Sequence, residues 1–315
     1  MTWNFERIAG PYQGGMGGLA WDGGKMLFSV IDEGFIRSFD PATAAVGEYR
    51  KYTNRVNGIA FAPDGRLFAC QDGGRRVIQF LPDGTAATTA TRLDGSIHNH
   101  PSDLVIDRAG RVWFSDPHSH VLAFGPQIFP ALDHASVLRL EIDERHAWTI
   151  RRVTYDTAAP RAVQLSADEK TLYVAEGEIG RTGPRELRAY PVQGGTVGRY
   201  TVLHTFGADH RGEHRGIEGM CLDSDGNIVA CGGWQKSGPG PLVYVFSPAG
   251  AVLETHKLPG EAPMRCAFGD AGLDSLYVTD GDGCVYRAQG VGRRGAARLR
   301  VLAGGRGTRN AQAAG

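Results

Sequence analysis

Short apolar runs separated by polar turns recur along most of this chain. Each unit has an apolar run, a turn rich in Asp, Gly or Asn, and a second apolar run, which is the pattern of a β-hairpin. The units begin 40 to 59 residues apart, at Gly17, Asn57, Ser102, Arg161, Glu218 and Arg265. A repeat of this period, with no competing helical period, is typical of a β-propeller.

A third apolar strand follows in every unit, and a more polar outer strand closes many of them. The third strands are expected at 35–39, 76–80, 136–140, 186–190, 242–246 and 284–288. Three or four strands repeated six times predict an all-β fold, a six-bladed β-propeller. We assign residues 1–290 to one propeller and 291–315 to a C-terminal closing strand and flexible tail. The ring could be closed by residues 5–9 or by residues 298–302, and the sequence leaves both open.

Composition and charge limit the binding partners and the cellular compartment that we expect for this chain. The chain has 34 basic and 34 acidic residues, so we expect neither a nucleic-acid nor a membrane partner. Its first residues lack a basic region followed by an apolar stretch, so no signal peptide is expected. The five cysteines are odd in number and show no C-x-x-C spacing. These features predict a cytoplasmic protein with free thiols.

The propeller architecture predicts where a site lies. The first residues of the six inner strands converge on the axis, so the six unit starts named above should share one small volume. Because neighbouring strands are antiparallel, the ends of the second strands should surround the same mouth. These second-strand residues are Asp32, Gln71, Asp72, Asp116, His118, Glu176, Glu178, Trp234, Asp280 and Asp282. His98, Asn99 and His100 lead into the third inner strand and are expected there too.

Two arginines and a glutamate at the axis have two interpretations. Buried charges persist only when they are paired, hydrogen-bonded or hydrated. Arg161, Glu218 and Arg265 could form an ion-pair plug that ties the blades together. Alternatively they could line a ligand cup, which we favour because polar residues gather on one face.

Three stretches resemble the SMP-30/gluconolactonase/LRE-like family. NGIAFAPDGRLFACQDGGRRVIQF at 57–80 is similar to the family's second blade, including its paired arginines. HNHPSDLVIDRAGRVWFSDP at 98–117 is similar to its N-x-P-N-D-L…W-F-T-D-P stretch, and APMRCAFGD…LYVT to a late P-x-N-x-A-F-G…L-Y-V-T stretch. The resemblance covers about residues 10–288. It implies a six-bladed propeller, a divalent cation, usually Ca²⁺, in the cup, and lactone hydrolysis as the commonest activity.

The chain departs from the ligand set that this resemblance implies. The family's first-blade glutamate corresponds to Gly17, and its asparagines to Ser102, Arg161 and Arg265. Its fifth-blade aspartate corresponds to Glu218. Ca²⁺ needs several oxygen ligands, and a guanidinium can replace a cation's charge with a permanent one. We therefore expect the calcium site to be lost, with Glu218 and Asp103 as the ligands if a metal is retained.

The remaining polar groups are candidates for catalysis and binding. The catalytic candidates are Glu218 as general base, Asp103 and His100 as alternatives, and Arg161 and Arg265 as groups that stabilise an oxyanion or grip a carboxylate. The substrate-binding candidates are Asn57, Ser102, Asn99, His98, His118, His214 and Trp234. The H-x-H pairs at 98–100 and 118–120 raise a second hypothesis, a transition metal bound by histidines.

Three functions follow from these candidates. The first is a hydrolase that opens a lactone or related cyclic ester of an anionic small molecule. The second is a non-hydrolytic enzyme, an isomerase, lyase or cyclase, acting on such a molecule. The third is a non-catalytic propeller that binds a ligand. The insertion at 123–135 is expected to act as a lid. The sequence does not indicate an oligomeric state.

Overall fold

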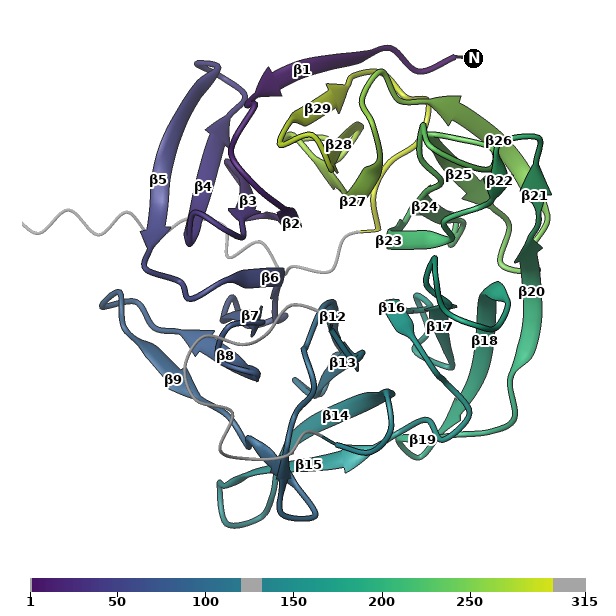
Figure 1. The fold of residues 1–315 in the computed structure, drawn as a ribbon. Coiled ribbons are helices and arrows are strands. Elements are labelled where there is room, and N and C mark those ends of the chain that lie inside the picture. The colour runs from purple at the N-terminus through teal and green to yellow at the C-terminus, as the bar shows by residue number, and fades with distance from the viewer. Residues whose placement is uncertain (1, 120–131, 297–315) are drawn as a thin grey trace, which may run out of the picture.

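The computed structural model describes residues 2–119 and 132–296, and every regular element in these ranges is a β-strand. Six sheets surround a central axis (Figure 1), which confirms the prediction of a six-bladed β-propeller. The innermost strands of the six blades are, in order, β2 (Met16–Trp21), β6 (Val56–Phe61), β12 (Leu104–Ile106), β16 (Pro160–Leu165), β23 (Ile217–Leu222) and β27 (Pro263–Gly269).

Each blade continues outward by antiparallel pairing between consecutive strands. The second strands are β3 (Met26–Val30), β7 (Leu67–Gln71), β13 (Val112–Asp116), β17 (Thr171–Glu176), β24 (Ile228–Gly232) and β28 (Ser275–Asp280). The third strands are β4 (Phe35–Asp40), β8 (Arg76–Phe80), β14 (Ser136–Ile142), β18 (Arg185–Gln193), β25 (Leu242–Phe246) and β29 (Val285–Ala288). All six third strands overlap the ranges that the sequence predicts.

The outermost strands and a few short pairs complete the sheets. The outer strands are β5 (Ala45–Lys51), β9 (Ala86–Thr88), β15 (Trp148–Arg152), β20 (Thr201–Phe206), β26 (Val252–Lys257) and β1 (Phe5–Ala9). The short elements are β10 (Arg92–Leu93) with β11 (Ser96–Ile97), β21 (Ala208–Asp209) with β22 (Gly212–Glu213), and β19 (Thr196–Val197) on β18.

The N-terminal strand closes the ring. β1 pairs with β29, with Phe5 opposite Ala288, so the first and last parts of the propeller share the sixth blade (Figure 1). Of the two closures that the sequence allows, the structure uses residues 5–9. The alternative strand at 298–302 lies outside the described residues. Within 291–296, Gly295 forms an isolated antiparallel bridge to Asp223, at the end of β23.

The apolar core lies between neighbouring blades. One cluster joins Met16 and Phe28 of the first blade to Tyr277 and Val285 of the sixth, and others join each later pair of neighbours in the same way. Sheet packing of this kind buries both faces of each blade and leaves the axis as the place where polar side chains meet. Among the described residues, no helix has the length and apolar character needed to cross a membrane.

Candidate functional site at the propeller mouth

Irregular pairing at the start of the inner strands positions the side chains at the mouth. Five of these strands, β2, β6, β16, β23 and β27, shift register against their neighbour within their first residues. A β-bulge leaves one residue unpaired and redirects its side chain, and bulges are common beside active sites. In β16 the extra residue is Arg161, and in β23 it is Glu218.

These register shifts also show that Arg265 is not equivalent to the other unit starts that are predicted to converge on the axis. The shift in β27 lies between Pro263 and Arg265, so the counterpart of Arg161 and Glu218 is Met264. Arg265 is one residue further along and pairs with Thr279. The prediction that Arg265 is the sixth equivalent residue is therefore wrong by one position, because the chain bulges at Met264. Sequence spacing cannot locate such a bulge.

Arg161, Glu218 and Arg215 form an ion-pair network at the mouth. Arg161 donates to Oε2 of Glu218 from Nε at 3.2 Å and from Nη2 at 2.7 Å, and Nε of Arg215 lies 3.2 Å from Oε1. The Glu218 side chain is 4% exposed. Burial alone would raise its pKa, but the charges of Arg161 and Arg215 outweigh burial and hold the pKa at about 2. Glu218 is thus ionised and a weak base.

The fourth blade extends this network toward solvent. Nη1 of Arg161 lies 3.3 Å from Oε1 of Glu178, and Nε of Arg181 donates to the other oxygen of Glu178 at 2.9 Å. Arg181 also donates to the carbonyl oxygen of His118 at 3.5 Å, so His118 lies beside the network as expected. Burial, and then the charge of Arg181, lower the pKa of His118.

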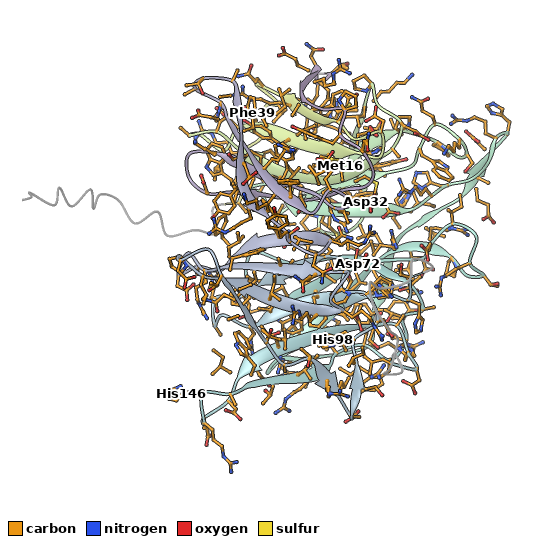
Figure 2. The ribbon with its side chains drawn as sticks, turned by 60° about the vertical axis from the view of Figure 1, so that its left-hand side comes forward. Met16, Asp32, Phe39, Asp72, His98 and His146 are labelled. Atoms are coloured by element: carbon orange, nitrogen blue, oxygen red, sulfur yellow. The ribbon has the colours of Figure 1, made fainter. Side chains whose placement is uncertain are left out.

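A histidine–carboxylate pair lies on the opposite part of the same mouth. Nδ1 of His100 lies 2.7 Å from Oδ1 of Asp72, and Nε of Arg55 donates to Oδ2 of Asp72 at 3.2 Å. Arg55 also pairs with Asp32, and Figure 2 shows Asp32 and Asp72 on the same side of the ring. Burial raises the pKa of Asp72, but the interactions with His100 and Arg55 together outweigh burial, and the pKa lies below its usual value. Asp72 is therefore available to orient and stabilise the imidazole.

Arg265 crosses the axis beneath these groups. Its Nη2 donates to Oγ of Ser102 at 2.9 Å and lies 3.5 Å from Oδ1 of Asn57, while its Nε is 3.9 Å from Oδ1 of Asp103. The sixth and third blades face each other across the ring, so this side chain separates the mouth from the lower channel. Burial raises the pKa of Asp103, against the charge of Arg265 and the N–H of Val163. Ser102 and Asn57 thus line the axis as predicted, and they are already bonded to Arg265.

Three predicted binding residues do not line the mouth. His98 and Asn99 are fully buried: the ring of His98 bonds to the carbonyl of Ala90, and Asn99 bonds to the backbone oxygens of Asp116 and His134. His214 is 1% exposed and bonds to Tyr244. Burial lowers the pKa of both His98 and His214 to about 4. These side chains are neutral and hold the blades together, which corrects their assignment to substrate binding.

Trp234 lies close to the mouth, where it packs against Arg215. The guanidinium of Arg215 lies 5.5 Å from the Trp234 ring, whose Nε1 donates to Ser237. Arg215, Arg181 and Arg55 are mouth residues that the sequence analysis did not name. Arg55, Arg215 and His100 precede the unit starts Asn57, Glu218 and Ser102 by two or three residues. A search for polar residues just before each unit start would have found Arg55 and Arg215.

The residues present do not fit a calcium ion. Gly17 has no side chain, both oxygens of Glu218 are paired with arginines, and Oγ of Ser102 accepts from Arg265. Among the described residues, no three His, Cys, Asp or Glu side chains are grouped so that they could hold a metal ion. The predicted H-x-H chelate is not formed at 98–100, because His98 points into the blade. His120, and residues 123–131 of the expected lid, lie outside the described residues.

The comparisons with known proteins agree with this fold. The profile of the "SMP-30/Gluconolactonase/LRE-like region" matches residues 17–282. The chain belongs to the SMP-30/gluconolactonase/LRE-like family. A gluconolactonase of Zymomonas mobilis is 27% identical over 71% of this chain, and the match spans 60% of that relative's length. The pentonolactonase XacC of Haloferax volcanii is 29% identical over 82% of this chain and 80% of its own.

A solved structure extends the likeness to three dimensions. The gluconolactonase of Xanthomonas campestris superimposes with a TM-score of 0.75 at 24% identity, covering 91% of this chain and 89% of its own. The family match over residues 17–282 confirms the predicted family resemblance. Within the SMP-30/gluconolactonase/LRE-like fold, this chain holds its mouth together with arginine–carboxylate pairs.

Proposed function

We propose that this chain hydrolyses a lactone at the propeller mouth, with His100 as the general base. The observation that carries the proposal is the 2.7 Å contact between His100 and Asp72. A carboxylate on one ring nitrogen fixes the tautomer and leaves the other nitrogen to take a proton, as in hydrolytic triads. Family membership, and the lactonase names of the relatives, support the reaction class.

The ion pairs at the mouth supply the electrostatic part of the reaction. A guanidinium carries five N–H groups. Among the described residues, Arg161 donates three of these N–H groups to Glu218 and Glu178. The other two are left for a substrate oxygen. Its charge is fixed by the neighbouring Glu218, which raises the pKa of Arg161. Fixed N–H donors that face a developing oxyanion are often the largest contribution to such catalysis.

The proposed steps use only these groups. His100 takes a proton from water as the water oxygen bonds to the lactone carbonyl carbon, and Arg161 stabilises the oxyanion that forms. The ring C–O bond then breaks, and the imidazolium returns its proton to the departing alkoxide. The product is the open hydroxy acid. In this scheme Glu218 positions Arg161, while Asp103 and Arg265 support the mouth from below.

The preferred substrate in this proposal is a small lactone that also carries a carboxylate. The partly exposed guanidiniums of Arg161 and Arg181 share one carboxylate, Glu178, and each keeps N–H groups for a second anion. Trp234 and His118 would bound the same volume. An aldarate lactone and a neutral aldonolactone of equal ring size separate the anionic preference from lactone hydrolysis itself.

Hydrolysis by the full chain tests the proposal. Acid release from glucono-1,5-lactone, a pentonolactone and an aldarate lactone would be followed in a pH-stat, with spontaneous opening subtracted. His100→Asn should lower kcat by about 10²–10⁴-fold, the usual worth of a general base. The matched control is His146→Asn. His146 lies in the turn between β14 and β15, away from the mouth (Figure 2), with a positive φ that Asn accepts, and its loss should leave kcat unchanged.

The mass of the product distinguishes the other functions. Hydrolysis adds one water to the substrate, whereas isomerisation or cyclisation without water does not. Turnover without added water would replace the proposal with the non-hydrolytic alternative. Saturable binding of the aldarate lactone without turnover would indicate the non-catalytic alternative. Equal activity of the His100 and His146 variants would remove His100 as the base.

A further inference from the structure

The lower half of the central channel is an apolar cavity with no part in the proposed reaction. It measures about 430 Å³ and is lined by the lower portions of the inner strands of all six blades. Its walls include Leu19, Ile59, Leu104, Val163, Met220 and Phe268. Cavities of this size hold small-molecule ligands, and a mostly apolar wall with one or two polar groups is typical of them.

The charged end of this cavity is Arg265. Among the described residues that line the cavity, only Arg265 and Asp103 carry a charge. Arg265 is 5% exposed, and its Nε and Nη1 have no hydrogen-bond partner among the described residues. The nearest carboxylate oxygen, Oδ1 of Asp103, is 3.9 Å from Nε, and Oδ2 of Asp103 accepts from the N–H of Val163. A buried guanidinium with unused donors is costly, and an anion in contact with it would remove that cost.

The register of the inner strands places small residues at the level of Arg265. The residues at the level of Arg265 in the first, second and fifth blades are Gly18, Gly58 and Gly219, and in the fourth blade Ala162. A Cβ at Gly18, Gly58 or Gly219 would lie 2.5 to 2.7 Å from a backbone atom of the next blade, so these glycines let the inner strands approach closely at the level where Arg265 crosses the axis. Below that level the wall is apolar. The channel is therefore itself amphipathic, with Arg265 and Asp103 at one end.

We propose that this channel binds a small amphipathic carboxylate, with its carboxylate on Arg265 and its apolar chain between the inner strands. The occupant enters from the end opposite the mouth, near Trp21, Leu273 and Ala296. Residues 297–315 contain four arginines and no Asp or Glu, so they offer no side-chain carboxylate to Arg265. The site is separate from the proposed lactone site, since Arg265 lies between the two.

Binding of straight-chain carboxylates to the full chain tests this site. Isothermal titration would compare hexanoate, octanoate and decanoate, with decanol as the uncharged control of equal chain length. Each methylene buried should tighten Kd by about fourfold until the cavity is full. Decanoate should bind once per chain and at least tenfold more tightly than decanol, the usual effect of a hydrogen bond to a charged group.

Two variants keep the test decisive. Arg265→Gln should weaken decanoate at least tenfold and leave decanol unchanged, while Ala60→Phe, which fills the channel below Arg265, should abolish both. A thermal melt of each variant checks that it folds. Equal affinity for decanoate and decanol, or undiminished decanoate binding by both variants, would overturn the proposal. So would absence of binding to the full chain, the result expected if its own residues 297–315 occupied the channel.

Discussion

Arg161 and Glu218, from neighbouring blades, are joined by two hydrogen bonds to a single carboxylate oxygen, at 2.7 and 3.2 Å. Arg215 approaches the other oxygen at 3.2 Å. This arrangement is the ion pair between blades that the sequence allows as one interpretation of the axial charges. It lies at the rim of the mouth rather than across the axis, which Arg265 crosses separately. A supporting ion-pair network therefore lies at the same mouth where we propose the lactone site.

Removing the charge of Glu218 should destabilise the protein. Glu218→Gln leaves Arg161 and Arg215 next to a neutral amide in a buried position, and breaking one partner of a buried pair costs about 3–5 kcal/mol. Urea unfolding at pH 7 would measure this loss. Glu33→Gln is a suitable control, because the Glu33–Arg37 pair is more exposed and should contribute under about 1 kcal/mol. A loss for Glu218→Gln no larger than that of the control would contradict the buried pair.

The same carboxylate should make stability depend on acid pH. The folded pKa of Glu218, about 2, lies below the unfolded value of 4.5. The stabilisation is therefore complete above about pH 4.5 and is lost as pH falls toward 2, and it amounts to about 3 kcal/mol. The difference in unfolding free energy between the native chain and Glu218→Gln should accordingly shrink between pH 5 and pH 3. A constant difference over this range would show that Glu218 titrates normally when folded.

Calcium should neither stabilise nor activate the protein. A ligand that binds only the folded state adds about 2.7 kcal/mol at a hundredfold excess over its Kd. Because the oxygens of Glu218 and Ser102 are paired with arginines, Tm should be the same in 1 mM CaCl₂ and in EDTA, and lactonase activity should survive dialysis against EDTA. The metal content of protein purified without chelator completes the measurement. Stoichiometric calcium, or a Tm that rises with CaCl₂, would contradict the conclusion drawn from the donor set.

The sequence was sufficient for the fold but only partly for the site. Alternation of apolar runs and Asp-Gly turns fixes the strands, because each hairpin is a local structure whose turn chemistry is visible in the residues. The bulge at Met264 is a property of pairing between strands, so the displacement of Arg265 was not predictable from spacing. The burial of each histidine, which spacing does not reveal, also determines whether its side chain reaches the mouth. His98 and His100 are two residues apart, yet one bonds Ala90 inside the blade and the other bonds Asp72 at the mouth.

Gly17 should be required by the close approach of the first two blades. A Cβ at Gly17 would lie 2.7 Å from the carbonyl oxygen of Asn57, a backbone atom that cannot move aside cheaply. Gly17→Ala should therefore destabilise the protein by about 1–3 kcal/mol, the usual cost of overpacking. Gly15→Ala is the matched control, because its Cβ would meet no atom closer than 3.6 Å. Equal melting temperatures for the two variants would mean that the inner strands can separate.

Trp3 should fasten the closing strand to the ring. Its ring stacks on His256 with centroids 3.8 Å apart, and its Nε1 donates to the carbonyl of Val291 at 2.9 Å. These contacts lie just before β1, which is the outermost strand of the sixth blade among the described residues, so the packing of Trp3 and Phe5 adds to the pairing with β29 in holding β1 in place. Trp3→Ala should lower the unfolding free energy by about 3–5 kcal/mol, as for other buried aromatics.

Tyr52→Ala is the control for Trp3→Ala. It removes an aromatic that is 87% exposed and should leave stability within about 0.5 kcal/mol of the native chain. Urea unfolding of both variants measures the difference, and hydrogen exchange at 285–288 should accelerate in Trp3→Ala alone. Unchanged exchange at those amides would indicate that β1 is held by its pairing with β29 and not by Trp3.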